Sequence, residues 1–283
     1  MKQRRVIVLS LLAAILVGLI LWVVWGNQAL ELNAYTITSD SLPDAFSGFR
    51  IALVSDLHNA EMGSENEKLL AMLREAAPDL IAITGDLVDS RRTDIDLAIR
   101  FVEQAAQIAP CYYVTGNHEA RLTEVEHADF EHQLVEVGVT VLHDDEVIIA
   151  RQGQQISLIG IDDPDFAEKH GGVGLDMNPK HISELSTVDT FTVLLSHRPE
   201  FFQQYVQSGT ELILSGHAHG GQIRLPLIGG LFAPNQGIFP EYDAGLYAEG
   251  STNLIVSRGI GNSLFPFRIN NRPEVILIEL QQG

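Results

Sequence analysis

The 283-residue sequence has few positive charges and a single cysteine. Its 18 lysines and arginines face 37 aspartates and glutamates, so the formal net charge is −19 at pH 7. Such an acidic chain repels the phosphate backbone, which excludes non-specific binding of nucleic acid. Cys111 has no partner for an intramolecular disulfide, and its place in an apolar run predicts a small buried hydrophobe. We find no internal repeat, no low-complexity tract and no feature that indicates an obligate protein partner.

One uncharged apolar run, residues 6–25, has the roughly 20 residues that a bilayer-spanning helix needs. Lys2, Arg4 and Arg5 precede it, and Trp22 and Trp25 lie at its far end, where indole rings suit the lipid headgroups. Lysine and arginine side chains that flank a membrane helix are enriched on its cytoplasmic side. We therefore predict that residues 1–26 anchor the chain in the cell membrane by a single pass, with the remaining domain outside the cytoplasm. A secretory signal that is cleaved on export is the alternative, and it also places the domain outside.

The remaining chain has the pattern of one α/β domain over residues 50–283, after a linker at 27–49 that contains a candidate edge strand at 32–38. Short apolar runs predict strands at residues 51–54, 80–83, 112–114, 139–142, 147–150, 156–161, 191–195, 212–214, 254–256 and 275–280. Helical periodicity predicts helices at residues 65–76, 94–106 and 124–137. Loops are predicted at 162–180 and from residue 223 onward. Alternation of strands and helices is typical of a largely parallel central sheet.

Five short polar motifs each follow one of the predicted strands. In chain order they are Asp56-Leu57-His58, Gly85-Asp86, Gly116-Asn117-His118-Glu119, Ser196-His197 and Gly216-His217-Ala218-His219. Ligands of such sheets bind beyond the carboxyl ends of the strands, so the five motifs are predicted to converge on one crevice. Each motif alone is weak, because aspartate and histidine are ordinary loop residues. The ordered set predicts a site.

The motifs offer carboxylate, amide and imidazole ligands without a thiolate, which suits two Mn, Zn or Fe ions. Two ions about 3.5–4 Å apart need a bridging ligand, and Asp86 is the natural candidate. Such a pair predicts hydrolysis of a phosphate mono- or diester by a hydroxide that bridges the ions. His118, next to Asn117, is predicted to protonate the leaving group, with Asp89 or Glu119 orienting it.

With these motifs the chain resembles the calcineurin-like metallophosphoesterases, and closely their membrane-anchored or exported bacterial branch. The similarity is carried by residues 49–58, 216–226, 257–263 and 268–273, and it extends from about residue 50 to 280. It implies a four-layer α/β/β/α sandwich, with two facing sheets and helices outside. It also implies a first metal held by Asp56, His58, Asp86 and His219. The second metal is then held by Asp86, Asn117, His197 and His217, and His118 contacts the substrate phosphate.

Residues outside the motifs have more than one interpretation. Arg198 follows His197, and Arg258 lies among glycines, so each is either a ligand of the substrate phosphate or a residue with local packing only. The apolar residues 225–232 predict a core segment, with an acyl chain or the bilayer as alternative contacts. Five histidines without ligand spacing are interpreted as surface or loop residues: His127, His132, His143, His170 and His181.

Three functions fit this sequence. The leading prediction is a phosphoesterase that acts on a phosphorylated small molecule or lipid. A hydrolase of a lipid pyrophosphate, such as a nucleotide-linked acylated sugar, is favoured by the anchor and opposed by the predicted outside location, because such precursors are cytoplasmic. A non-catalytic module with structural metals is opposed by the complete ligand set and by His118.

Overall fold

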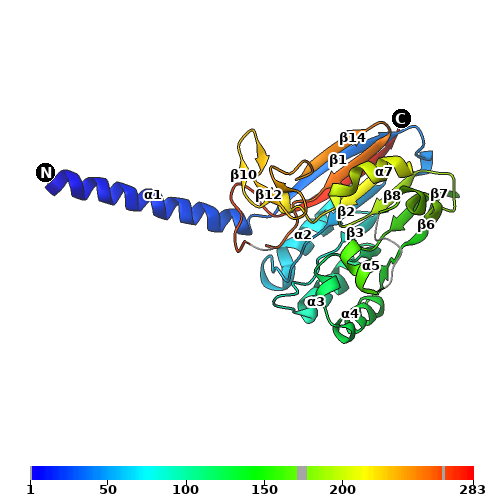
Figure 1. Ribbon diagram of the computed structural model, residues 1–283, viewed down its shortest axis with the longest axis horizontal. Coiled ribbons are helices and arrows are strands. Elements are labelled where there is room, and N and C mark those ends of the chain that lie inside the picture. The colour runs from blue at the N-terminus through cyan, green and yellow to red at the C-terminus, as the bar shows by residue number, and fades with distance from the viewer. Residues whose placement is uncertain (1, 171–176, 263–264) are drawn as a thin grey trace.

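The computed structural model describes residues 2–170, 177–262 and 265–283, which form a projecting helix and a layered domain (Figure 1). Helix α1 (Lys2–Gln28) extends away from the domain. Its segment Gln3–Gln28 is long and apolar enough to cross a membrane, and the domain buries none of its most apolar stretch. The free and buried Cys111 confirms the small hydrophobe expected from the sequence.

Two six-stranded sheets form the middle of the domain, in the orders β1-β16-β2-β3-β4-β5 and β14-β15-β9-β8-β7-β6. The first contains β1 (Glu31–Ser39), β2 (Arg50–Val54), β3 (Leu80–Thr84), β4 (Cys111–Val114), β5 (Val139–Val141) and β16 (Glu274–Gln282). The second contains β6 (Asp145–Arg151), β7 (Gln154–Gly160), β8 (Thr192–Leu195), β9 (Leu212–Ser215), β14 (Gly245–Glu249) and β15 (Thr252–Val256). Pairing is parallel except for β16 with β2, β14 with β15 and β6 with β7.

Alternate residues of the central strands point to two different cores. Ile51 and Leu53 of β2 pack between the two sheets, against residues such as Leu195 of β8. Ala52 and Val54 face the other way, under the helices. A strand buried on both faces reads as a continuous apolar run, which is why the sequence shows these strands clearly.

Helices cover both outer faces, which confirms the four-layer α/β/β/α sandwich. The first sheet is covered by α2 (Glu67–Ala76), α3 (Ile95–Ala106) and α4 (Glu124–Glu136). The second is covered by α6 (Pro179–Leu185) and α7 (Phe202–Ser208), while α5 (Pro164–His170) lies beside α4. Two of these helices have N-terminal caps. Asp94 caps α3 by accepting from the backbone N–H of Leu97, and Thr123 caps α4 in a capping box with Glu126.

The expectation of largely parallel strand pairing is confirmed, but the strands divide between two sheets, as the family resemblance implies, and do not form the one central sheet that strand–helix alternation alone indicates. The candidate edge strand at 32–38 is β1, which pairs in parallel with β16 along its whole length. The predicted loop 162–180, part of which lies outside the described residues, contains α5 and the start of α6. With seven residues each, α5, α6 and α7 are too short to show a clear helical period.

The predicted loops after residue 223 contain two short antiparallel hairpins. They are β10 (Arg224–Leu225) with β11 (Gly229–Gly230), and β12 (Phe232–Ala233) with β13 (Gly237–Ile238). In the turn between β10 and β11, the side chain of Leu227 is fully exposed and that of Ile228 is exposed by 65%. The prediction of a core segment at 225–232 is therefore wrong.

His143 is a structural residue, which corrects its interpretation as an ordinary loop histidine. Its Nε2 lies 2.7 Å from Glu131 Oε1 on α4, and its Nδ1 lies 2.9 Å from Asp162 Oδ1 after β7. The side chain therefore joins the helical layer of the first sheet to a strand end of the second. Hydrogen bonds to Asp162 and Glu131 raise the pKa of His143 to about 10. His127, also on α4, is buried rather than exposed.

Replacement of His143 by alanine is expected to lower the free energy of unfolding by about 1 kcal/mol, because the imidazole is 39% exposed and water screens its ion pairs. A histidine with a raised pKa stabilises the fold fully below its ordinary value of 6.5 and loses this contribution as the pH rises through about 10. Chemical denaturation of both proteins at pH 6 and pH 10 measures the effect. The difference should shrink at pH 10, and a constant difference would contradict the ion-pair account.

Candidate active site

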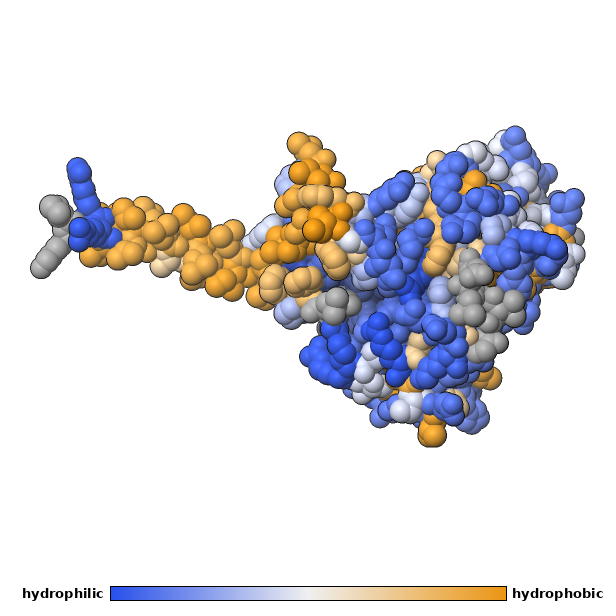
Figure 2. Space-filling model, in the orientation of Figure 1, coloured by the Kyte–Doolittle hydropathy of each residue, from blue (hydrophilic) through white to orange (hydrophobic). Residues whose placement is uncertain are grey.

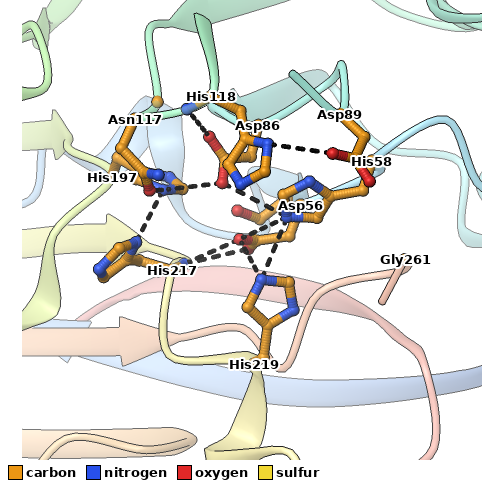
Figure 3. Close-up of polar contacts among 12 residues, drawn as sticks. Asp56, His58, Asp86, Asp89, Asn117, His118, His197, His217, His219 and Gly261 are labelled. Carbon is orange, nitrogen blue, oxygen red and sulfur yellow. Dashed lines mark hydrogen bonds and ion pairs between the residues drawn. The ribbon is translucent and has the colours of Figure 1, made fainter. Parts of the chain in front are cut away.

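The five motifs meet where the two sheets face each other with their strand ends (Figure 3). Three motifs follow β2, β3 and β4 of the first sheet, and two follow β8 and β9 of the second. The structure brings together all seven residues predicted as metal ligands: Asp56, His58, Asp86, Asn117, His197, His217 and His219. All seven are buried. The convergence predicted from the strand ends is confirmed.

The first ligand group comprises Asp56, His58, Asp86 and His219, whose ligand atoms all lie within 4.8 Å of one another. His58 Nε2 is 3.3 Å from Asp86 Oδ2, and His219 Nε2 is 3.3 Å from Asp56 Oδ1. The two imidazole Nε2 atoms are only 3.1 Å apart. Two carboxylates and two imidazoles therefore surround one small volume.

The second ligand group comprises Asp86, His197 and His217, and it shares Asp86 with the first. His197 Nε2 lies 3.4 Å from Asp86 Oδ2 and 3.2 Å from the side-chain oxygen of Asn117. Both groups use the same oxygen, Asp86 Oδ2, at nearly equal distances from His58 and His197. A shared carboxylate between two adjacent ligand groups is the arrangement that a two-metal site requires.

In two histidines of the second group, one ring nitrogen donates a hydrogen bond outside the group, so the lone pair of the other ring nitrogen points into the group. The Nδ1–H of His197 donates to the backbone oxygen of Thr84 at 2.7 Å, so its Nε2 is left as an acceptor. The Nε2–H of His217 donates to the side-chain oxygen of Asn235 at 3.0 Å, so its Nδ1 is the acceptor. When both rings are neutral, these two acceptor nitrogens face each other at 3.1 Å and cannot hydrogen bond to each other, so the space between them needs either a proton on His197 Nε2 or a cation. A cation between them resolves the conflict, and this donor set fits a divalent metal.

Charges within the site follow from burial. Burial lowers the pKa of His58 to about 3, against the attraction of Asp86, so this imidazole is neutral as a metal ligand must be. Burial disfavours charge on His197 too, but the Asp86 carboxylate outweighs it and raises that pKa to about 10, so an ion that binds between His197 and Asp86 displaces a proton from Nε2. Burial raises the pKa of Asp56 to about 6. A site with this much buried negative charge attracts cations strongly.

Five of the predicted ligands hold their backbone in the left-handed region. They are Asp56, His58, Asp86, His217 and His219, with φ between 45° and 64°. For residues with a Cβ this conformation costs about 1–2 kcal/mol each. Such strain is typical of functional sites, where the surrounding structure fixes the geometry. Here backbone bonds fix it: the N–H of Asp56 donates to Gly85 O at 3.1 Å and that of His58 to Asp86 O at 2.9 Å.

Two motif glycines are required by close approach. A Cβ on Gly116 would overlap Oδ1 of Asp86, and a Cβ on Gly216 would overlap the side chains of Ser55 and Asp56. These glycines let the loops after β4 and β9 come close enough to bring carboxylate and imidazole into one site.

Glu119 holds the loops after β3 and β4 together through backbone hydrogen bonds. Its buried carboxylate accepts the backbone N–H groups of Asp86 at 2.9 Å, Gly116 at 2.8 Å and Val88 at 3.2 Å. It thereby ties the loop after β3 to the loop after β4. Of the two residues predicted to orient His118, the one in contact with it is Asp89, whose Oδ1 lies 3.5 Å from His118 Nδ1.

His118 projects into the pocket above the ligands. The backbone N–H of Ser90 donates to its Nδ1 at 3.0 Å, so the neutral ring carries its proton on Nε2. Burial lowers the pKa of His118 below its usual value, while the carboxylates of Asp86 and Asp89 oppose that shift. The ring packs edge-on against His58, with centroids 4.4 Å apart. Contacts with a backbone N–H and a neighbouring ligand hold the ring in one orientation.

The two arginines predicted to bind substrate have other partners. Arg198 borders the pocket, but Asp163 pairs with its Nε and also lies 2.9 Å from its Nη2. Arg258 lies outside the pocket, where its Nη2 bonds Glu31 at 2.7 Å and Glu274. The segment 257–262 packs beside Asp56, because a Cβ on Gly259 would overlap the Asp56 side chain. Ser263 lies outside the described residues.

Arg91 and Arg121 border the pocket on the side of His118, and no sequence pattern predicts either of them as a site residue. Arg91 bonds Asp89 through Nε and Nη2, both at 3.0 Å. Arg121 is exposed, with Nη1 3.5 Å from His118 Nε2. Both lie a few residues beyond a motif, in loops whose course the sequence pattern does not predict. They bring positive charge to the mouth of a site in a strongly acidic protein.

Comparison with known proteins agrees with this geometry. Residues 49–221 match the family described as calcineurin-like phosphoesterase. The Escherichia coli (strain K12) protein named phosphodiesterase YaeI is 32% identical over 246 residues, 84% of each chain. A Bos taurus protein named transmembrane protein with metallophosphoesterase domain is 30% identical over an alignment 296 positions long, which covers 99% of this chain and 64% of that protein. The solved structure of Thermus thermophilus sulfate thiohydrolase SoxB has a TM-score of 0.52 at 14% identity, over 77% of this chain and 53% of that one, a likeness of fold.

Proposed function

The chain belongs to the calcineurin-like phosphoesterases, a metal-dependent class of phosphoric ester hydrolases, and from this premise we propose how its residues divide the work. Its buried ligand groups fit two divalent ions. The observation that carries the proposal is the shared oxygen of Asp86, which lies between the two groups.

The first ion is held by Asp56, His58, Asp86 and His219. The second is held by Asp86, Asn117, His197 and His217. This division is supported by the two groups of ligand atoms and by the acceptor nitrogens of His197 and His217. Mixed oxygen and nitrogen ligands without thiolate favour Mn, Zn or Fe.

When bound, the two ions supply activation of water and neutralisation of charge on the phosphate. The chain's own contribution is a proton at the leaving oxygen. His118 Nε2 borders the pocket, and the ring can give up its Nε2 proton only as an imidazolium whose second proton lies on Nδ1, where Asp89 Oδ1 at 3.5 Å stabilises the charge; the step leaves a neutral ring with its proton on Nδ1. The ester therefore enters with its phosphate over Asp86 and its leaving oxygen towards His118.

Arg121 attracts the anionic ester at the pocket mouth. Replacement of Arg121 by alanine is expected to raise KM for a phosphate ester about tenfold, because a charge-assisted hydrogen bond to phosphate is lost. The metal content should not change, since Arg121 is not a ligand. Steady-state kinetics measure this effect, with Arg100→Ala on the exposed face of α3 as the matched control. A change in kcat alone, without a change in KM, would contradict the binding role.

We further propose that α1 anchors the enzyme in a membrane, with the domain outside the cytoplasm. The membrane-spanning length of α1 and the name of the Bos taurus relative support the anchor. Lys2, Arg4 and Arg5 before the apolar stretch support the orientation. In the alternative, the segment is a signal that is cleaved on export. A reporter fused to the C-terminus shows on which side of the membrane the domain lies in either case.

The type of ester is tested by the full chain in detergent, with p-nitrophenyl phosphate and bis-p-nitrophenyl phosphate as substrates. Each is assayed with added Mn²⁺, Zn²⁺ or Fe²⁺ and with EDTA. Faster turnover of the diester supports a phosphodiesterase, and faster turnover of the monoester supports a phosphatase. Absence of turnover of both, on protein that holds two ions, would contradict the proposed reaction.

A further inference from the structure

Seven large apolar side chains are exposed on one part of the domain. We define them as the apolar rim: Leu227, Ile228, Phe232, Ile238, Phe239, Phe265 and Phe267. Leu227 is fully exposed, and Ile228 and Ile238 are exposed by 65% and 70%. Five of the seven lie on the hairpins of β10 to β13, whose residues 225–239 contain no charged side chain. A contiguous apolar surface of this kind marks an interaction site.

The apolar rim lies beside the end of α1 at which the helix enters the domain. Figure 2 shows the apolar colour continuing from α1 onto a protrusion of the domain next to it. Phe267 lines a depression together with Val23 and Val24 of α1. The backbone oxygens of Phe265 and Phe267 accept hydrogen bonds from Gln222, at the base of the hairpins. The rim and the helix end thus form one continuous surface.

The position of α1 on the domain is fixed by polar contacts rather than left to a linker. The Asn27 side chain donates to Arg268 O at 2.9 Å and accepts the N–H of Arg268 at 2.7 Å. The Arg272 guanidinium lies 5.1 Å from the ring centroid of Trp25 and donates to Ala29 O at 2.7 Å. If α1 crosses a membrane, these contacts also fix how the domain faces that membrane.

We propose that the apolar rim lies in the interfacial layer of the membrane that α1 crosses. Trp22 and Trp25 mark that layer on α1, and the rim begins at the same end of the helix. The hairpins satisfy much of their backbone internally, by the pairs of β10 with β11 and β12 with β13, as a segment in contact with lipid must. The contact between the rim and the membrane is apolar, so it does not depend on attraction between the acidic domain and anionic lipid.

The same hairpins form a wall of the catalytic pocket. Pro234 and Asn235, in the turn between β12 and β13, line the pocket, and Asn235 accepts from His217 Nε2. Gly221 and Gly230 approach so closely that a Cβ on either would overlap the other, which fixes the hairpins against the His219 loop. Docking of the rim therefore places the pocket next to the membrane surface. It follows, on the basis of the proposed function, that the enzyme selects amphiphilic phosphoesters carried in the membrane.

The docking is tested by fluorescence of the full chain reconstituted in phosphatidylcholine vesicles. Leu227→Cys and, separately, Ile238→Cys are labelled with the environment-sensitive dye NBD, while the native Cys111 is buried and does not compete. Val125→Cys is the matched control, because Val125 is 80% exposed and its helix, α4, lies away from α1 in Figure 1. We expect blue-shifted emission at both rim positions, quenching by doxyl-labelled lipid, and severalfold weaker quenching by aqueous iodide than at position 125.

Labels at both rim positions that are as accessible to iodide as the label at position 125 would overturn the proposal. Shielding that increases with the number of chains per vesicle would also overturn it, because a second copy would then cover the rim. These readings need no turnover, so their failure is distinct from a failure of the proposed function.

The substrate class is tested with Leu227→Asp, which lies outside the catalytic machinery. We expect hydrolysis of soluble bis-p-nitrophenyl phosphate at the rate of the unaltered protein, which also shows that the variant folds. Hydrolysis of p-nitrophenyl dodecyl phosphate in vesicles should fall severalfold. Equal retention of both activities would overturn the inferred preference for membrane-borne esters.

Discussion

Replacement of Asp86 by asparagine is expected to remove both ions and to lower kcat by more than about 100-fold. Loss of a residue that merely supports a metal ligand already costs about 10–100-fold. Asp86 Oδ2 is shared by the two ligand groups, at 3.3 Å from His58 and 3.4 Å from His197. Asparagine keeps the shape but lacks the charge that a bridging ligand supplies. Metal analysis of the purified protein and hydrolysis of bis-p-nitrophenyl phosphate measure the two effects.

The control for this variant is Asp129→Asn, on the exposed face of α4, which removes one negative charge far from the site. It should keep the metal content and the rate of the unaltered protein. A thermal unfolding profile distinguishes loss of metal from loss of fold. Asp86→Asn protein that is folded and retains two ions would refute the assignment of Asp86 as the bridge.

Replacement of His118 by asparagine is expected to lower kcat by about 10²–10⁴-fold without loss of metal. His118 is next to the ligand Asn117, but its Nδ1 accepts from Ser90 N–H and its Nε2 faces the pocket. The loss should be largest for esters whose leaving group is a poor one, such as alkyl esters, because these need a proton most. Rates across a series of aryl and alkyl phosphate esters of graded leaving-group pKa measure the dependence.

His132→Asn is the matched control, because His132 is 70% exposed on α4, where it pairs with Glu136 of the same helix. It should behave as the unaltered protein for every ester. A uniform loss across the ester series in His118→Asn would argue for binding of phosphate alone and against proton donation.

Much of this fold follows from the sequence because its central strands are buried on both faces. Strands such as β2 and β3 read as unbroken apolar runs, and each ends directly before a site motif. The motifs therefore predict the ligands without knowledge of the sheet order. The local sequence pattern does not predict how the strands divide between two sheets, because pairing partners such as β1 and β16 are more than two hundred residues apart. Here the resemblance to a family supplied what periodicity did not.

The residues around the ligands are less predictable. Arg121 and Arg91 reach the pocket through loop conformations, and Arg258 is drawn away from it by Glu31 and Glu274. A guanidinium has several carboxylate partners in so acidic a chain, and only the fold decides among them. Asn235 lies in a hairpin turn predicted as a loop, yet it sets the tautomer of His217. Contacts of this kind depend on approach between loops, which no spacing in the sequence encodes.

The central claim, that two ions share Asp86 and are both needed for hydrolysis, is tested most directly by metal titration. The full chain in detergent is stripped with EDTA, and Mn²⁺ is added back in steps while bound metal and hydrolysis of bis-p-nitrophenyl phosphate and p-nitrophenyl phosphate are followed together. We expect no hydrolysis in EDTA, and activity that rises until two ions are bound per chain. Full activity at one ion per chain, or activity that survives the removal of metal, would contradict the account.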